Sequence, residues 1–525
     1  MTKRNHFTKI VSFLMALVMI LGMFSMTAFA GVTSASTGKI TIDGLQDADA
    51  TNAKADIYQI ITVNTDEDSQ QPKDPEFMWV PAVADWLKAN GYGTLVADDG
   101  SVSNTFSKDT YGEASAAYPL ENANAAALAT LYDKMAAAIG NNSLVLTSAG
   151  TRTGNGDIGN LAMGNYLVLI SGGKNVYRPS TANIVPVYDT VNKEWKVEDA
   201  TVVIKSTKPS ITKTVDKNKV AIGDTVTYTV TADVPVFPEN AINKKFFIGD
   251  LLGEGLTLDA DSIKVVGLTE DAQEDITTGY TQTTTNATNV NGGADLTFSL
   301  DFEYNTFKNY KKIQVTYTAK VNKNVVTGYG ETTNPGNLNT AYLEYTNKPY
   351  GANDYEEDTA EVKVYSYGMD LTKVDKNDAN TTLEGAEFKL TNAENTALTF
   401  TKVTDGQYKY DPTGTDTLTS GTNGKLVIFG LNVGKYTLTE TKAPAEYNIA
   451  KDPFDVTLTA DGEEGAITDH ANGILVMNIQ NSKGFSLPST GGMGTVLFTV
   501  AGIALIALGA GMIVIIKKRN SKTAE

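Results

Sequence analysis

The chain has 525 residues, with 61 acidic and 43 basic side chains, so its net charge is strongly negative. A surface of this charge repels nucleic acid, which excludes nucleic-acid binding. The chain has no cysteine and only two histidines, so disulfides, histidine-based zinc sites and catalytic triads are excluded, and we expect neither a metal site nor a cofactor.

The N-terminus has the pattern of a secretory signal peptide. Basic side chains precede an apolar stretch at residues 10–24, and Ala28-Phe29-Ala30 is a small-x-small cleavage site. We therefore expect residues 1–30 to be removed and the mature chain to lie outside the cytoplasm.

The exported part is too long for one hydrophobic core and indicates about three domains. A Lys-Pro junction at Lys205–Pro209 and a tyrosine-marked junction at Val364–Gly368 divide it. The expected limits are 31–206 for the first domain, 207–365 for the middle domain and 366–484 for the third.

Two features set the first domain apart. The stretches Val80 to Asn90 and Leu120 to Gly140 are rich in alanine and have helical spacing, so they predict helices inserted into or beside a sheet. The acidic stretches Asp47–Asp56 and Asp66–Asp68 have carboxylates suited to calcium but no calcium-loop motif. We interpret them as solvated turns.

The remaining pattern is that of β-strands. Thr225–Thr231 and Lys312–Ala319 alternate polar and apolar residues, and their threonine, aromatic and β-branched side chains favour a half-buried strand. Turn signals such as Asn291-Gly292-Gly293 separate such runs. The expected fold class is mainly β, with three tandem immunoglobulin-like β-sandwich domains and helices in the first.

The alternation places three polar side chains on an inward face of the middle domain and repeats the same three types, in the same order, in the third. They are Lys213, Asp250 and Asn339 in the middle domain, and Lys373, Glu440 and Asn481 in the third. Burying an unpaired lysine, acid or asparagine lowers the stability of the fold by roughly several kcal/mol. The members of each set are therefore expected to meet. If a bulge shifts the alternation, Asn347 and Asn478 are the alternative asparagines.

Such a buried set is chemically reactive. Desolvation lowers the pKa of an amine and raises that of a carboxyl group, which favours an uncharged nucleophile beside a proton donor. The acid would polarise the asparagine carbonyl and shuttle protons while ammonia leaves. The predicted products are Lys213–Asn339 and Lys373–Asn481 isopeptide bonds, with Asp250 and Glu440 as the catalysts.

The C-terminal segment, 485–525, combines three signals in a fixed order. Leu487-Pro488-Ser489-Thr490-Gly491 precedes an apolar run from Met493 to Ile516, and Lys517-Lys518-Arg519 follows. A run of this length can cross a hydrocarbon core of about 30 Å as a helix, and the basic cluster holds the C-terminus in the cytoplasm.

These motifs resemble those of Gram-positive surface proteins. The pentapeptide Leu487–Gly491 resembles the LPxTG sorting signal, which sortase cuts between threonine and glycine before passing the threonine acyl group to an amine. Residues 434–444 (GKYTLTETKAP) look like the E-box of collagen-adhesin B-type domains, and the segments 371–375, 383–388 and 481–484 also match those domains. Ile248–Leu252 resembles the acid-bearing strand of the pilin middle domain.

The resemblance implies the structural backbone subunit of a covalent pilus, not an enzyme, on the cell wall surface. Its expected partners are sortase, neighbouring pilin subunits, tip and accessory pilins, and peptidoglycan. The attacking lysine of this family ends a tryptophan-marked motif, and Trp195 followed by Val202-Val203-Ile204-Lys205 places Lys205 there, although Ile204 stands where the family has proline.

Three alternative hypotheses stay open at this point. Lys208 is the alternative nucleophile for joining to Thr490. A monomeric wall-anchored adhesin is the alternative function, and a wall-anchored enzyme comes third because no nucleophile–base pair stands out.

Overall fold

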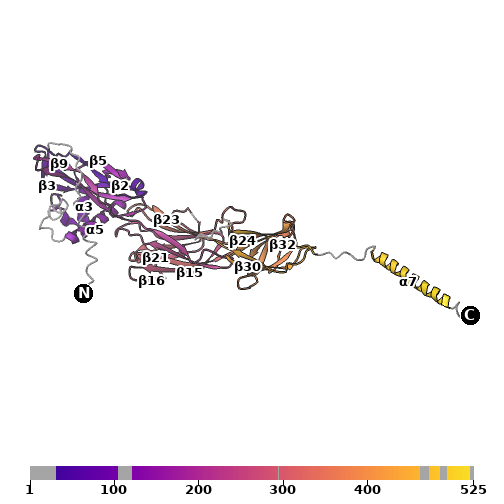
Figure 1. Ribbon diagram of the computed structural model, residues 1–525. Helices are drawn as coiled ribbons and strands as arrows, with labels where there is room; N and C mark the ends of the chain where they lie inside the picture. Colours follow the sequence, from indigo (N-terminus) through magenta and orange to yellow (C-terminus); the bar gives the residue numbers. More distant parts are fainter. Residues whose placement is uncertain (1–30, 104–120, 294, 461–471, 485–493, 521–525) are drawn as a thin grey trace, which may run out of the picture. The chain divides into compact units, whose positions relative to one another are not determined.

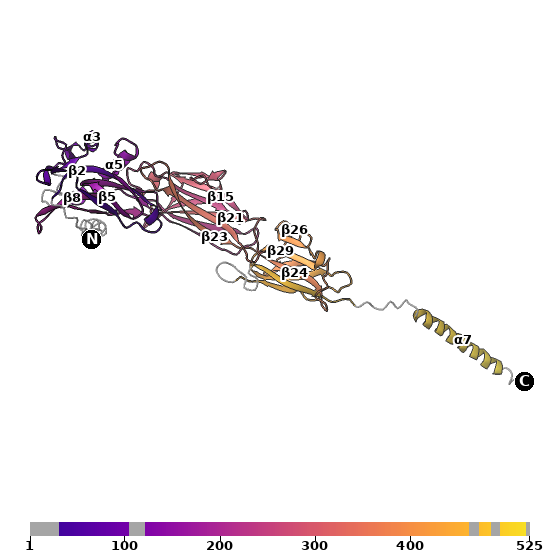
Figure 2. The same cartoon turned by 90° about the horizontal axis from the view of Figure 1, so that it is seen from above.

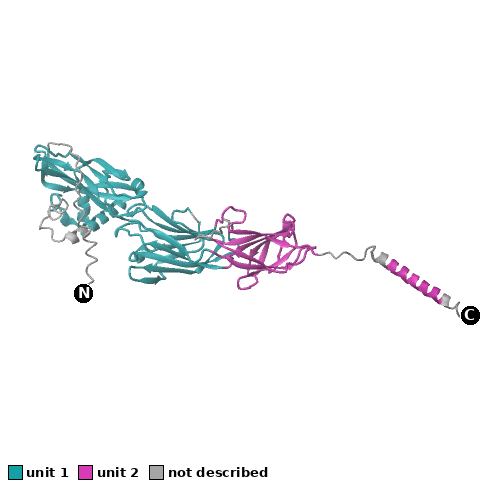
Figure 3. Cartoon of the chain, viewed as in Figure 1, with its two compact units in different colours: residues 1–218, 224–325, 336–364 teal, residues 219–223, 326–335, 365–525 magenta. Residues whose placement is uncertain are grey.

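The computed structural model describes residues 31–103, 121–293, 295–460, 472–484 and 494–520. The chain divides into two compact units (Figure 3). Unit 1 comprises residues 1–218, 224–325 and 336–364, and unit 2 comprises residues 219–223, 326–335 and 365–525. The expected first and middle domains thus fall mainly in unit 1 and the expected third domain in unit 2, while the domain limits themselves stay predictions.

The first part of unit 1 is a β-sandwich of a large and a small sheet. The large sheet has the order β3-β2-β6-β8-β9 with β4 paired to β2, and the small sheet has the order β10-β1-β5, with β1 and β10 parallel. Their strands are β1 (Thr37–Ile42), β2 (Lys54–Asp66), β3 (Gln71–Trp79), β4 (Gly150–Thr153), β5 (Gly156–Ala162), β6 (Gly164–Ser171), β8 (Ser180–Asp189), β9 (Glu194–Glu198) and β10 (Ala200–Val202). Buried side chains from both sheets, such as Ile42 and Val168, share one core.

Helices accompany this sandwich, as the alanine-rich stretches predict (Figure 1). The two predicted helices are α3 (Pro81–Ala89) and α5 (Glu121–Gly140), and the structure adds the short α2 (Asp49–Asn52) and the 3-10 turn η1 (Gly93–Leu95), which were not predicted. Helix α3 begins at Pro81, where the missing N–H of proline costs no hydrogen bond. Val83 and Leu87 of α3, one turn apart, pack with Met135 of α5 in a second apolar core.

The middle part of unit 1 consists of two five-stranded sheets with the orders β12-β13-β21-β15-β16 and β17-β20-β14-β22-β23. The first sheet contains β12 (Ile211–Val215), β13 (Thr225–Asp233), β15 (Leu256–Leu268), β16 (Gln273–Ile276) and β21 (Lys312–Val321). The second contains β14 (Phe246–Leu252), β17 (Tyr280–Thr283), β20 (Phe298–Phe302), β22 (Asn337–Thr346) and β23 (Tyr355–Val364). Short elements complete unit 1: β7 (Val176–Tyr177), β11 (Ser206–Thr207), β18 (Ala287–Thr288), β19 (Asp295–Leu296) and α6 (Tyr304–Phe307).

The interior of these two sheets follows the predicted alternation. In β13, Val226, Tyr228 and Val230 are buried while their neighbours face outward, and β21 has the same pattern. The rings of Phe298, from one sheet, and Tyr317, from the other, meet edge to face with centroids 5.0 Å apart. The two sheets therefore pack face to face as a sandwich.

Unit 2 is a further sandwich with the sheet orders β26-β27-β29-β24-β32 and β28-β25-β30-β31. Its elements are β24 (Tyr367–Asp375), β25 (Glu387–Asn392), β26 (Phe400–Thr404), β27 (Gln407–Tyr410), β28 (Leu418–Thr419), η2 (Thr422–Gly424), β29 (Lys425–Leu431), β30 (Gly434–Lys442), β31 (Phe454–Leu458) and β32 (Ile474–Asn481). Strand β24 lies beside β29 (Figure 2), and on its other edge it pairs in parallel with β32.

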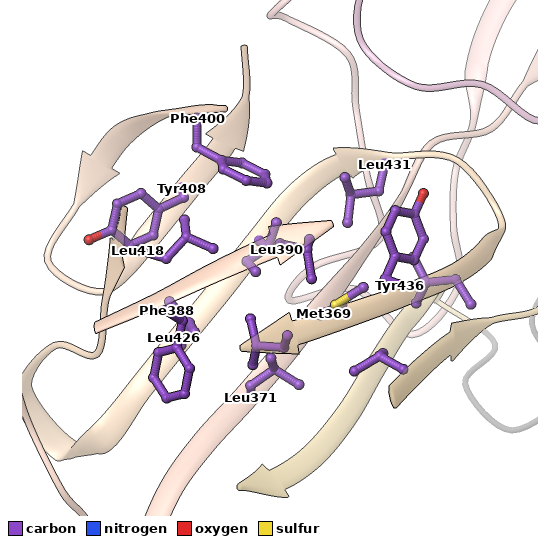
Figure 4. Close-up of a cluster of buried hydrophobic side chains, with 14 of the residues drawn as sticks. Met369, Leu371, Phe388, Leu390, Phe400, Tyr408, Leu418, Leu426, Leu431 and Tyr436 are labelled. Atoms are coloured by element: carbon purple, nitrogen blue, oxygen red, sulfur yellow. The ribbon is translucent and has the colours of Figure 1, made fainter. Parts of the chain in front are cut away.

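The core of unit 2 contains side chains from both sheets (Figure 4). Met369 and Leu371 of β24 are fully buried there, together with Phe388 and Leu390 of β25. Because strand side chains alternate between faces, the next inward position on β24 is Lys373. The inward face of β24 thus carries a buried lysine next to the apolar core.

Helix α7 (Gly494–Asn520) contains the predicted apolar run within the described residues (Figure 1). Its segment Thr499–Lys518 has a mean hydropathy of 2.5 and is long and apolar enough to cross a membrane. Mainly β structure with a C-terminal apolar helix is the fold class that the sequence predicts.

Candidate functional site

Unit 2 brings Lys373, Glu440 and Asn481 together in its interior. Lys373 Nζ lies 2.7 Å from Asn481 Oδ1 and 3.1 Å from Glu440 Oε1. The Asn481 amide donates to both oxygens of Glu440, at 2.9 and 3.0 Å. The side chains of Lys373 and Glu440 have no exposed surface, so the amine, the carboxyl group and the carboxamide meet away from water.

The strand arrangement explains this meeting. Lys373 on β24 and Asn481 on β32 belong to neighbouring parallel strands of one sheet. Glu440 lies on β30 in the facing sheet, so its side chain reaches across the core. One of its oxygens also accepts a hydrogen bond of 2.6 Å from the Ala450 backbone N–H, which holds the carboxyl group in place.

The surroundings of Lys373 are apolar. Its Nζ lies 5.2 Å from the ring centroid of Phe388 and 5.1 Å from that of Phe454. Burial lowers the pKa of Lys373, although the attraction to Glu440 opposes this shift. A lowered pKa increases the fraction of uncharged amine, which is the nucleophilic form.

The middle part of unit 1 holds the second set, with a tyrosine added. Lys213 Nζ donates to Asp250 Oδ2 at 2.5 Å and to the Tyr317 hydroxyl at 2.8 Å. The Tyr317 hydroxyl donates to Asp250 Oδ1 at 2.8 Å, and Asn339 Nδ2 donates to the Tyr317 oxygen at 2.8 Å. The side chains of Lys213 and Asp250 have no exposed surface, and Asn339 is fully buried.

Burial moves both ionisable partners in this set toward their neutral forms. It raises the pKa of Asp250 to about 6, against the opposing effects of Lys213 and Tyr317. It lowers the pKa of Lys213, against the attraction to Asp250. An uncharged amine beside a protonated carboxyl group and a carboxamide is the set of groups needed to exchange one amide for another with release of ammonia.

The alternative asparagines lie elsewhere. Asn478 is exposed on β32, on the face opposite Asn481. Asn347 is buried just beyond β22, where its backbone carbonyl accepts a hydrogen bond from the Gly172 N–H. Among the described residues, Lys213 Nζ donates to Asp250 and Tyr317, not to Asn347. The structure therefore places Asn339 and Asn481, not the alternatives, beside the lysines.

The two candidate lysines for joining subunits lie near the end of the first part of unit 1. Lys205 is exposed between β10 and β11, and its carbonyl accepts a 3.0 Å hydrogen bond from the Arg178 N–H. Partial desolvation, with a smaller effect from the Arg178 charge, lowers the pKa of Lys205. Lys208 instead forms an exposed ion pair with Asp47, 3.2 Å from Nζ to Oδ2.

Other sequence expectations have mixed outcomes. The signal peptide, 1–30, and the sorting motif from Leu487 to Gly491, including Thr490, lie outside the described residues. The interpretation of the acidic stretches as solvated turns was wrong for Asp49. Asp49 is buried and accepts hydrogen bonds from the Lys174 and Asn175 backbone N–H groups and the Tyr177 hydroxyl, because an internal carboxylate needs such donors.

Sequence reasoning missed Tyr317 and its neighbour Tyr228. The two rings stack with centroids 5.4 Å apart, and Lys213 Nζ lies 5.3 Å from one centroid and 5.4 Å from the other. A signal was present, because the alternation that turns Lys213 inward also turns both tyrosines inward on the neighbouring strands. Buried tyrosines are common core residues, so their hydroxyl groups gave no separate indication.

Comparison with known families divides the chain along similar lines. Residues 203–353 match the family described as cell surface antigen I/II C2 terminal domain, and residues 368–471 match the prealbumin-like fold domain. Residues 479–523 match the LPXTG cell wall anchor motif. The last match covers both the pentapeptide and helix α7.

Curated proteins and a solved structure extend the likeness. The chain is 25% identical over 415 residues to the trypsin-resistant surface T6 protein of Streptococcus pyogenes serotype M6, covering 61% of this chain and 71% of that protein. It is 28% identical over 355 residues to fimbrial subunit type 1 of Actinomyces viscosus, covering 60% of this chain and 65% of that protein. The solved T6 backbone pilin aligns with a TM-score of 0.57 at 17% identity, covering 86% of this chain and 100% of that one, which supports the sandwich fold.

Proposed function

The chain belongs with the Gram-positive backbone pilins that carry an LPXTG cell wall anchor, and from this premise we propose how its subunits are joined and strengthened. Sortase cuts between Thr490 and Gly491 and transfers the Thr490 acyl group to Lys205 of the neighbouring subunit. Repetition gives a covalent homopolymer, and the last transfer attaches it to peptidoglycan. Tip and accessory pilins are the further partners.

Access and reactivity support Lys205 as the nucleophile. The side chain is exposed in the segment between two short strands, where an enzyme can approach it. Its lowered pKa reduces the cost of forming the free amine that attacks the thioacyl intermediate. The Lys208 ammonium instead lies in an exposed ion pair with Asp47.

The observation that carries the proposal furthest is the presence of one buried lysine–acid–asparagine set in each unit. We propose that each set forms an isopeptide bond: Lys213 to Asn339 with Asp250 as catalyst, and Lys373 to Asn481 with Glu440 as catalyst. Packing holds the reacting groups at an effective concentration of roughly 10⁵ M or more. A chain without cysteine thereby gains an internal covalent brace in each unit, which suits a fibre under tension.

Replacing Lys205 by alanine is expected to abolish the ladder of high-mass species that the wild type gives when cell-wall extracts are run on denaturing gels. The variant should remain on the wall as a monomer, because Thr490 can still be transferred to peptidoglycan. Thr490→Ala should lose both the ladder and wall attachment.

Lys208→Ala is the matched control and should keep the ladder. A ladder that persists in Lys205→Ala and disappears in Lys208→Ala would identify Lys208 as the nucleophile. If the wild type forms no ladder, the chain acts as a monomeric wall-anchored adhesin.

A further inference from the structure

The two buried sets differ in how the acid reaches the asparagine. In unit 2, Glu440 accepts hydrogen bonds from Asn481 directly. In unit 1, Asp250 makes no direct hydrogen bond with Asn339 within the described part of the chain. Both groups contact the Tyr317 hydroxyl instead, each at 2.8 Å.

The sheet layout explains this difference. Asp250 and Asn339 lie on the neighbouring strands β14 and β22, but Asp250 pairs with Ala341, two residues from Asn339. Such diagonal neighbours lie about 7–8 Å apart, which is beyond the reach of a short aspartate side chain. Tyr317 projects from β21 in the facing sheet, and its hydroxyl contacts both side chains. In unit 2 the acid itself comes from the facing sheet and is one methylene longer.

We propose that Tyr317 is a catalytic residue of the unit 1 cross-link and carries the proton from Asp250 to the departing nitrogen of Asn339. This inference rests on the proposed isopeptide bond between Lys213 and Asn339. It assigns the Tyr317 hydroxyl a chemical role, since that group touches Lys213 Nζ, Asp250 Oδ1 and Asn339 Nδ2.

The proton and bond changes balance without any further reactant. Uncharged Lys213 Nζ attacks Cγ of Asn339, forming the Nζ–Cγ bond, and passes one proton to Asp250 Oδ2. In the resting site the Tyr317 hydroxyl hydrogen is directed at Asp250 Oδ1. In the proposed step this hydrogen turns toward Nδ2, so that Asp250, protonated on Oδ1, gives that proton to the Tyr317 oxygen while Tyr317 releases its own proton to Nδ2. The Cγ–Nδ2 bond then breaks and ammonia leaves, with Tyr317 and Asp250 both restored to their starting protonation.

The timing of this relay follows from amide chemistry. In the planar amide, Nδ2 has no available lone pair and donates its hydrogen to Tyr317, as the structure shows. Once Cγ becomes tetrahedral, Nδ2 gains a lone pair and can accept the tyrosine proton. Tyr317 keeps its own proton beforehand, since burial raises the pKa of its hydroxyl well above the usual value.

Tyr228 provides a matched comparison in the same site. Its ring is stacked on that of Tyr317, and its hydroxyl is equally enclosed. Burial raises the pKa of Tyr228, and the nearby Asn339 amide opposes this shift. No hydrogen bond joins the Tyr228 hydroxyl to any described residue. Removing this hydroxyl therefore removes a polar atom without interrupting the relay.

The test is the intact mass of the full-length chain, followed over time after synthesis, in wild type, Tyr317→Phe and Tyr228→Phe. Peptide mapping assigns each missing ammonia to a unit. In Tyr317→Phe the unit 1 bond should form about 10²-fold more slowly or not at all, the range expected for loss of a general acid–base group. The unit 2 bond, whose lysine lies against Phe388 and Phe454, should form as in the wild type, which shows that the effect is confined to unit 1. Tyr228→Phe, in the same core as Tyr317, controls for the folding of unit 1 after loss of a buried hydroxyl group.

Tyr228→Phe should form both bonds at the wild-type rate. Formation of the unit 1 bond at the wild-type rate in Tyr317→Phe would overturn the relay while leaving the cross-link itself standing. Equal slowing in both tyrosine variants would also overturn it, because that result would reflect packing of the tyrosine pair. A wild type that lacks the unit 1 bond would overturn the proposed cross-link and the relay together.

Discussion

Glu440→Ala is expected to leave the chain one ammonia lighter than its calculated mass, where the wild type is two ammonias lighter. Without the acid, none of the other described hydrogen-bond partners of Lys373 and Asn481 can take the proton from Lys373 and return it to the leaving nitrogen of Asn481. The site in unit 1 is separate and should react normally. Asp250→Ala should give the converse result, with the remaining bond mapped to unit 2.

Glu440→Gln controls for packing in this experiment, since it keeps the size of the side chain and one carbonyl acceptor but cannot carry the proton. It should show the same single deficit as Glu440→Ala. Retention of both deficits in these variants would show that the acid is not required. A wild-type mass without any deficit, in fully folded protein, would contradict both cross-links.

Loss of the unit 2 cross-link is expected to lower the stability of that unit by about 4–5 kcal/mol, by analogy with a disulfide that closes a similar loop. Lys373 and Asn481 are 108 residues apart in sequence, so the bond removes much of the freedom of the unfolded chain. Lys373→Met replaces the lysine by an apolar side chain of similar length. The melting temperature of this variant should be on the order of 20 °C below that of the wild type, and trypsin should cut it faster.

Lys389 provides a matched control for Lys373, because it takes no part in the site. Lys389, on β25 of the same unit, forms an exposed ion pair with Asp416 at 2.6 Å, and exposed pairs contribute little. Lys389→Met should keep both ammonia deficits and the wild-type melting temperature. Equal protease resistance in Lys373→Met and Lys389→Met would contradict a stabilising bond in unit 2.

The alternation of side chains determined which polar groups are internal. A strand exposes successive residues to opposite faces, so the inward positions of Lys213, Asn339 and Lys373 follow from their apolar neighbours two residues away. The helices near residues 80–90 and 120–140 could also be predicted, because alanine content and spacing are local properties. The C-terminal apolar run is a local signal of the same kind.

Only the tertiary structure decided which internal groups meet and by what route. Strand neighbours are set by packing between segments that are far apart in the sequence, and alternation does not identify them. The sequence presents the two sets as equivalent, yet Glu440 crosses from a facing sheet to Asn481, while Asp250 shares a sheet with Asn339 and reaches it through Tyr317. The burial of Asp49 likewise depends on donors more than a hundred residues away, because the cost of an internal charge is offset only where the fold supplies such groups.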